Sequence, residues 1–296
     1  MMDDGFPASL VRPLLQSIKM QQWEANLALD FWHESGRTYL ARRKHDGPLV
    51  IQKTLYPEGQ AICHGVIVHP PGGVAAGDQL ALRVRVEYGA NVLLTTPGAG
   101  KWYKSSGGQA HQTLDFEVKT NACLEWLPQE NILFDASQVR WGAQVNLEKN
   151  AKYAGWEITC FGRQAQNEVW STGAMHQNVA IKRDGQLIWQ ERANVDGKNR
   201  LLQSVVGLHG NAVNASFIIA AGEIPMTVLN DCRDVTASMV LDLHAKKAVT
   251  ALPEVFVARY VGQSSQHARQ YFEMLWQILR PWYLGQAVTR PRVWNT

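Results

Sequence analysis

Cysteine is scarce in this chain, and the few cysteines that occur are widely spaced. The 296-residue sequence holds four of them and has no Cys-x-x-Cys pair. They are Cys63, Cys123, Cys160 and Cys232. A disulfide framework or a structural zinc site needs paired or clustered cysteines at short spacings. The pattern is instead typical of reduced thiols, and we expect a cytoplasmic protein.

Long apolar runs and a leader segment are lacking as well. No uninterrupted apolar stretch approaches the roughly 20 residues that a membrane-spanning helix requires. The first ten residues, MMDDGFPASL, are acidic and have no apolar centre, so we do not expect a secretory signal. Both features favour a soluble protein.

Charge of one sign is not in excess. The formal net charge is +3, with 19% charged and 46% hydrophobic residues, which is ordinary for a globular protein. Short basic runs such as Arg42-Arg43-Lys44 are simply explained as solvated strand ends. The balance therefore gives no support to a nucleic-acid partner.

The pattern that is present has a period of two. Apolar residues alternate with polar ones in 23–31, 80–88, 112–118 and 139–147. Such alternation predicts strands with one face on a core. Turn signals separate the strands, and Asp184-Gly185 predicts a two-residue hairpin. We expect a mainly β protein of stacked antiparallel sheets from about residue 20 to about residue 220.

The last quarter changes character. Apolar residues recur at three- and four-residue steps after Ser264, which predicts a capped helix that ends at Pro281. A second helix is predicted at Met226–Ala245 and a strand at Glu254–Val261. We expect a small C-terminal α/β portion at about 221–296. Because no repeat or linker divides the chain, 1–296 is predicted to be a single domain.

One segment imitates a nucleotide site. Thr95–Trp102 reads TTPGAGKW, in which a glycine and a lysine stand together. A P-loop needs a glycine five positions before that pair and a hydroxyl residue directly after it. Thr95 and Trp102 occupy those places, so the magnesium ligand is missing and a GTPase is excluded.

A second segment carries potential metal ligands. Cys63, His64 and His69 fall in one predicted strand, and Asp78 follows. Cys63 and His69 share a face but lie about 20 Å apart along an extended strand, and His64 points to the other face. One tetrahedral site cannot include all three without a fold-back. A turn through Pro70–Gly73 leaves a looser site with His69 and Asp78 open.

Signals for hydrolytic chemistry are missing. The sequence has neither a Gly-x-Ser-x-Gly elbow nor a His-Glu-x-x-His helix. Glu125, Glu157 and Glu191 fall inside apolar runs, where a carboxylate lies either on the solvent face or beside a polar cavity. For any single one of them, the solvent face is favoured. These residues do not indicate an enzyme.

Seven distinctive segments are spread along the chain. They are QKTLYPE (52–58), HPPGGVAAGDQL (69–80), TTPGAGKWYKSS (95–106), EWLPQENILFD (125–135), GWEITCFGR (155–163), RPWYLG (280–285) and RPRVWNT (290–296). Together they resemble the UreD (UreH) family of urease accessory proteins, and the resemblance follows the family's order from near residue 23 to the last residue.

The resemblance implies a fold and a function. The fold would be a β-helix-like stack of sheets with about two helices. The protein would be a non-catalytic scaffold that binds apo-urease and UreF, and through UreF the GTPase UreG. It would help nickel pass from UreG to the urease active site through an internal polar tunnel. No tightly bound cofactor is expected, only transient Ni²⁺.

The chemistry of nickel narrows the residues that would line such a tunnel. Imidazole and thiolate bind nickel strongly, so a conduit lined with them would trap the ion. Spaced carboxylates give weaker, exchangeable steps. The resemblance therefore points to Asp78, Glu157 and Glu191 as tunnel residues, with His64 and His69 as further candidates.

Two other functions stay open at this point. One is an enzyme, such as a hydrolase, that uses His64, His69 and Asp78 in a loose metal site. The other is a protein that stores nickel tightly. Both predict turnover or stoichiometric metal in the isolated chain, whereas the scaffold predicts co-elution with apo-urease and UreF.

Overall fold

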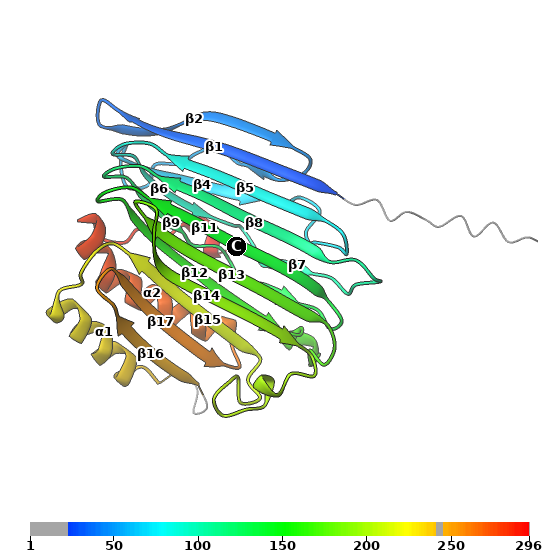
Figure 1. Cartoon of the computed structure of the whole chain (residues 1–296). Coiled ribbons are helices and arrows are strands. Elements are labelled where there is room, and N and C mark those ends of the chain that lie inside the picture. Colours follow the sequence, from blue (N-terminus) through cyan, green and yellow to red (C-terminus); the bar gives the residue numbers. More distant parts are fainter. Residues whose placement is uncertain (1–22, 241–244, 296) are drawn as a thin grey trace, which may run out of the picture.

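The computed structural model of this protein describes residues 23–240 and 245–295. In this part of the chain two β-sheets pack face to face, and helices cover the outer face of the second sheet (Figure 1). The first sheet contains, in spatial order, β14 (Gln186–Asp196), β13 (Ala174–Arg183), β11 (Gln138–Leu147), β8 (Ala110–Val118), β5 (Gln79–Val86), β1 (Glu24–Glu34) and β2 (Arg37–Asp46). The second contains β16 (Lys246–Ala251), β17 (Val255–Gly262), β15 (Val213–Ala220), β12 (Lys152–Phe161), β9 (Cys123–Trp126), β6 (Asn91–Thr95), β4 (Ile62–Val68) and β3 (Val50–Ile51). Short strands β10 (Asn131–Leu133) and β7 (Gly100–Trp102) continue from β12.

The chain winds from one sheet to the other. From β4 to β13 it alternates between the second sheet and the first, so that each sheet grows by one strand per coil. Neighbouring strands of successive coils therefore run parallel, as in β5–β8–β11–β13 and β4–β6–β9–β12. This confirms the mainly β, β-helix-like stack.

Strand direction differs in part from the expectation of antiparallel sheets. Antiparallel pairs occur in the hairpins β1–β2 and β13–β14, in β3–β4 and along β12–β15–β17–β16. The coils between them pair in parallel. The reason is that a half-buried strand alternates in the same way whichever direction its neighbour runs, so periodicity does not report direction.

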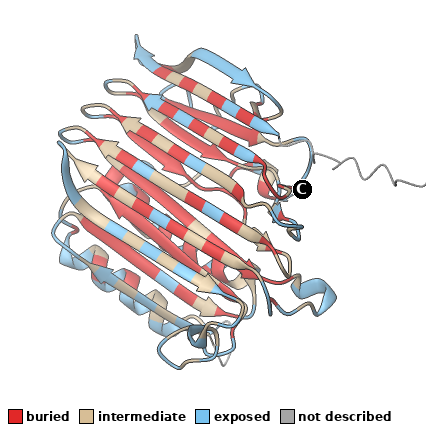
Figure 2. Ribbon diagram, turned by 45° about the vertical axis from the view of Figure 1, so that its right-hand side comes forward, coloured by how far each residue is buried: buried red, intermediate tan, exposed pale blue. Residues whose placement is uncertain are grey.

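The alternating residues meet in a core between the sheets. The apolar row of β5, Leu80 to Val86, is buried, and Arg83 and Arg85 point outward. Figure 2 shows the resulting bands of buried and exposed residues along the strands of the first sheet. The hairpin predicted at Asp184-Gly185 joins β13 to β14.

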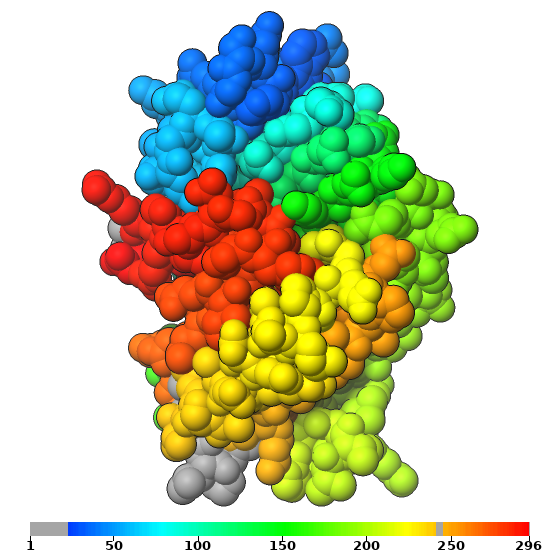
Figure 3. Space-filling model, turned by 90° about the vertical axis from the view of Figure 1, so that its left-hand side faces the viewer, coloured from blue at the N-terminus to red at the C-terminus, as the bar shows by residue number. Residues whose placement is uncertain are grey.

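A second core lies between the outer face of the second sheet and the helices. α1 (Met226–Ser238) and α2 (Ser265–Leu284) pack there, and Figure 3 shows both helices covering this side of the molecule. The helix predicted to reach Ala245 ends at Ser238, and residues 241–244 lie outside the described residues. None of the helices in residues 23–240 and 245–295 combines the length and apolar character needed to cross a membrane.

The predicted helix end at Pro281 is wrong. The Ser264 side chain caps α2 as expected, but Pro281 lies inside the helix, which continues to Leu284. A proline removes one helical hydrogen bond, and tertiary contacts can offset that loss. Here the Tyr283 hydroxyl donates to Glu125 Oε1 at 2.6 Å, which holds the last turn on the sheet. Gly285 then ends the helix in the left-handed conformation.

Candidate functional site

A cavity of about 350 Å³ lies between the two sheets where the strands of the second sheet end. It spans several coils. Its walls come from the end of β4, from β5 and β8 of the facing sheet, from β12 and from the loop before β7. Most of the lining is apolar, with His69 and Glu157 among the few ionisable residues. The coil winding thus places side chains that are far apart in sequence around one internal space.

Glu157 reaches this cavity from β12. Its row on the strand, with Tyr153 and Phe161, faces the first sheet. Gln177 Nε2 donates to Glu157 Oε2 at 3.2 Å, while Oε1 is buried without a hydrogen-bond partner in the described part of the chain. Burial raises the pKa of Glu157 to about 8, and the charge of Glu191 adds to the rise. At neutral pH this carboxyl group is therefore mainly protonated.

His69 lines the same cavity directly after β4. Its Nε2 is buried and, among the described residues, has no hydrogen-bond partner. Burial lowers the pKa of His69, and the charge of Asp78 works in the opposite direction. A neutral imidazole keeps one ring nitrogen able to bind a metal ion. The cavity therefore holds two buried polar atoms of metal-ligand type, one from His69 and one from Glu157.

Asp78 lies beside this site and is held by the backbone. Its Oδ2 accepts from the Ala75 N–H at 2.8 Å, and its Oδ1 accepts from the Trp23 N–H at 3.1 Å. The carboxylate thus caps the turn that follows the Pro70–Gly73 segment. Its charge still acts to raise the pKa of His69. The two residues are therefore close in space, which the sequence had left open.

Glu191 lies on β14 outside the cavity lining, and its charge acts on Glu157. Its carboxylate accepts two hydrogen bonds from Arg259 of β17, at 3.0 and 3.2 Å. The guanidinium also lies over the Trp189 ring, 6.0 Å from its centroid. Sequence reasoning did not select Arg259, although a charge inside the apolar run 255–261 was the same signal that selected Glu157.

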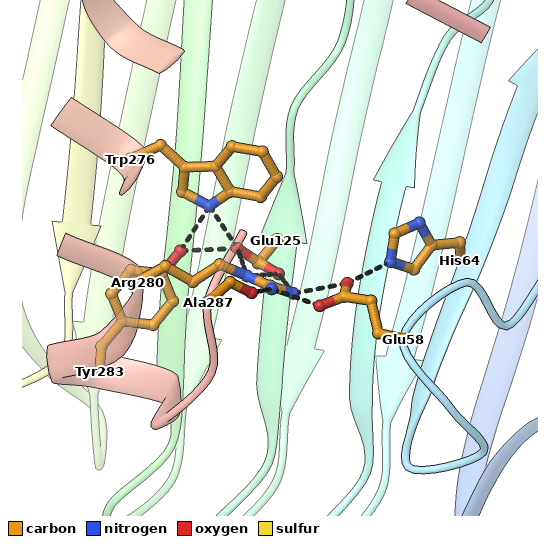
Figure 4. Close-up of polar contacts among 7 residues, drawn as sticks. All are labelled: Glu58, His64, Glu125, Trp276, Arg280, Tyr283 and Ala287. Atoms are coloured by element: carbon orange, nitrogen blue, oxygen red, sulfur yellow. Dashed lines mark hydrogen bonds and ion pairs between the residues drawn. The ribbon is translucent and has the colours of Figure 1, made fainter. Parts of the chain in front are cut away.

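His64 is separated from these residues. It lies on the opposite face of β4 from Cys63, and its Nε2 is 2.6 Å from Glu58 Oε1. Glu58 in turn accepts from Arg280 of α2. His64 therefore belongs to a charged cluster beneath the helix (Figure 4).

The charged cluster of Glu58, His64, Glu125 and Arg280 is almost fully buried. Arg280 is 0% and Glu125 1% exposed, and the guanidinium donates to both Glu125 oxygens, to Glu58 and to the Ala287 carbonyl. Trp276 Nε1 also donates to Glu125, at 2.7 Å. Because these groups bond to one another across elements, the cluster fastens α2 to the second sheet.

The solvent-face placement favoured for single carboxylates is wrong for Glu125 and Glu157. Both faces of the second sheet are covered, by the first sheet on one side and by α2 on the other. Single-strand periodicity does not show that a strand is covered twice. Arg280, which sequence reasoning missed, was detectable as a charge within the apolar stripe of the C-terminal helix.

Metal-binding residues are dispersed in the structure. In residues 23–240 and 245–295, His, Cys, Asp and Glu do not gather in groups of three or more that could hold a metal ion. His64, His69 and Asp78 accordingly form no common site in this part of the chain. What the geometry does bring together is His69 and Glu157 around one cavity, with Asp78 and Glu191 next to it.

Comparison with known proteins gives a consistent result. The family described as UreD urease accessory protein matches residues 24–295. A protein from Methylobacillus flagellatus named urease accessory protein UreD is 51% identical over 93% of this chain and 95% of its own length. Proteins of the same name from Azoarcus sp. and Dechloromonas aromatica are each 42% identical, over 93% and 96% of this chain and 94% and 98% of their own lengths.

Proposed function

This chain belongs to the UreD family of urease accessory proteins, and from that premise we propose that it serves urease maturation as a scaffold without turnover of its own. It binds apo-urease and UreF, and UreF connects it to the nickel-carrying GTPase UreG. Nickel then passes from UreG through this chain toward the urease active site. The proposal places the protein in the cytoplasm, where it carries Ni²⁺ as cargo and has no resident metal.

The observation that carries the nickel route is the pair of unpartnered atoms at the cavity. His69 Nε2 and Glu157 Oε1 are buried, and neither has a hydrogen-bond partner among the described residues. Burying a polar group without a partner costs free energy, roughly 1–3 kcal/mol per group. Such a cost is understandable where the groups serve a passing ligand, and both are ligand types that Ni²⁺ accepts.

The protonated state of Glu157 fits transport better than storage. A buried acid with a pKa of about 8 is mainly neutral at neutral pH, so an arriving cation must displace a proton to use the carboxylate. That exchange weakens binding and makes it reversible. Nickel that binds to one imidazole and one carboxyl group at a time can therefore dissociate again and move on.

Neighbouring residues have distinct roles in this route. Asp78 favours a cation at His69 through its charge, although both carboxylate oxygens are held by backbone N–H groups. Glu191 supplies the next carboxylate beyond Glu157. His64 stands apart from the route, because Glu58 holds its Nε2 within the charged cluster.

The route is tested with E157Q and H69A in a urease activation assay at limiting NiCl₂. Each variant should slow activation roughly tenfold, which is the lower end of the loss seen when a group that supports metal binding is removed. Higher nickel should restore part of the rate, because concentration can drive a weakened step. E117Q is the matched control, since Glu117 belongs to ion pairs with Arg85 and Lys119 at the surface. Full activation by both E157Q and H69A would rule out the cavity as the route.

The scaffold role is tested separately by size-exclusion chromatography. The full chain should co-elute with apo-urease and with UreF, and E157Q and H69A should co-elute as the wild type does. Their defect would then lie in nickel transfer and not in assembly. Failure of the wild-type chain to co-elute with either partner would contradict the scaffold itself.

A further inference from the structure

A row of polar side chains leads from the cavity across β15 to β17, the strand next to the edge strand β16 of the second sheet. Glu157 of β12 pairs with Ser216 of β15, and Ser216 pairs with Arg259 of β17. Adjacent strands lie about 4.8 Å apart, so the row spans roughly 10 Å between the outer Cα atoms. Paired residues share one face of a sheet, and this row faces the first sheet.

Apolar rows border this row on one side. There the next row on the same face contains Ile218 and Val257, and the one after it Ala220 and Val255, all in the core between the sheets. On the other side Thr159 pairs with Asn214, so polar residues continue along β12 and β15. Polar residues in such a position have no packing reason to be there. The row therefore extends the polar lining of the cavity toward solvent.

Arg259 and Glu191 meet where this row reaches solvent. The Glu191 side chain is 12% exposed and the Arg259 side chain 45%, so the guanidinium stands at the boundary of the buried region. It neutralises Glu191 through two hydrogen bonds. A cation that approaches from this side meets the positive charge of Arg259 first, and the Glu191 carboxylate behind it is already paired with that charge.

We propose that the Arg259–Glu191 pair is a gate at a second opening of the nickel route, with Arg259 as the residue that sets its cation selectivity. This rests on the proposed function. A cation uses Glu191 only after it displaces the guanidinium, which can swing into solvent because it is half exposed. Ni²⁺ binds imidazole nitrogen and carboxylate oxygen more tightly than Mg²⁺ does, and Mg²⁺ keeps several of its waters. The gate therefore holds back Mg²⁺ and admits nickel.

The gate predicts a gain of binding when Arg259 is removed. R259Q frees the Glu191 carboxylate beside Glu157, so isothermal titration with NiCl₂ should show roughly tenfold tighter binding than in the wild type. Urease activation by R259Q at limiting NiCl₂ should become sensitive to excess MgCl₂, whereas wild-type activation should not. R259K, which keeps the positive charge, should restore resistance to MgCl₂.

R85Q serves as the matched control. Arg85 bonds to Glu87 on the outer face of the first sheet at 2.7 Å, and its side chain is about as exposed as that of Arg259, at 47% against 45%. Its variant should match the wild type in nickel binding and in MgCl₂ sensitivity. Equal behaviour of R259Q and R85Q would overturn the gate. So would loss of co-elution of R259Q with apo-urease or UreF, because Arg259 would then be a docking residue.

A second variant covers the case in which R259Q does not fold. E191Q keeps the guanidinium but removes the carboxylate, so it should lower activation without tightening Ni²⁺ binding. Unchanged activation by E191Q would contradict the gate. The two proposals also fail differently. Full urease activation by both E157Q and H69A would contradict the nickel route. If E157Q and H69A are defective but R259Q and E191Q both behave like the wild type, only the gate is contradicted.

Discussion

Glu157 makes the stability of the fold depend on pH. Its pKa rises from an ordinary value of 4.5 to about 8 in the folded chain, mainly through burial. Between these values the folded state keeps a proton that the unfolded state releases, so its contribution to stability falls as pH rises through this interval. E157Q removes this dependence. In urea unfolding in metal-free buffer, the free energy of unfolding of E157Q should rise relative to that of the wild type as the pH increases from about 4.5 to about 8.

The control for this prediction lies in the same data. Near pH 4 Glu157 is mainly protonated in both the folded and the unfolded chain, so the two proteins should differ little in the pH-dependent part of the free energy of unfolding. A constant difference across the whole pH range would contradict the raised pKa of Glu157.

The four thiols should be unreactive in the folded protein. All four are buried and free, and burial raises the pKa of Cys63 to about 11 and of Cys160 to about 12. A rise of two units above an ordinary value of 9.0 lowers the thiolate fraction about 100-fold at neutral pH. A thiol-reactive dye should label the native chain very slowly and label four thiols in denaturant. Rapid native labelling of any cysteine would contradict its burial.

At the scale of elements, the charged cluster fastens α2 to the second sheet. R280M leaves Glu125 and Glu58 buried without their cation, and loss of one partner of a buried ion pair costs about 3–5 kcal/mol. Urea unfolding should show this loss in free energy of unfolding. R290Q is the control, because the Arg290–Glu273 pair near the same helix is partly exposed and should contribute less than about 1 kcal/mol. Equal effects of both variants would show that the cluster does not hold the helix.

Two turn glycines allow the cost of a positive φ to be distinguished from the cost of a steric clash. Gly47 and Gly36 both have positive φ, +74° and +77°. A Cβ at Gly47 would lie 2.2 Å from the Glu24 carbonyl oxygen, whereas a Cβ at Gly36 would meet open space. G36A should cost about 1 kcal/mol and G47A about 2 kcal/mol or more, because only the second also displaces β1. Thermal unfolding of the two variants measures the difference, and equal losses would contradict the close approach at Gly47.

The features that could be predicted well from the sequence are those that depend on a single strand or helix. The alternation of Leu80–Val86 and the cap at Ser264 are local, and both are confirmed. Parallel pairing, the burial of Glu125 and the passage of α2 through Pro281 depend on neighbours distant in sequence. The candidate site divides in the same way. Glu157, Arg259 and Arg280 each interrupt an apolar run, which the sequence shows, whereas their ion-pair and hydrogen-bond partners lie on other elements and are set by the fold.

At the scale of the whole molecule, the second sheet belongs to both cores. Along β12, Tyr153 and Phe161 pack between the sheets, while Trp156 and Ile158 pack under the helices. Neither the C-terminal helices nor the first sheet can leave without exposing one face of the same strands. The β body and the C-terminal α/β portion are thus bound through shared strands and not through a linker.

Shared strands predict one cooperative unfolding transition for the full chain. Loss of either core exposes apolar side chains of β12, β15 and β17, which destabilises the other core at the same time. Circular dichroism at far-ultraviolet wavelengths reports mainly the sheets. Thiol labelling of a C63A variant reports the core beneath the helices, because its three remaining cysteines, Cys123, Cys160 and Cys232, all pack there. The two signals should change at the same urea concentration. Separate midpoints would mean that the C-terminal portion unfolds by itself, and the single domain predicted from the sequence would then be two.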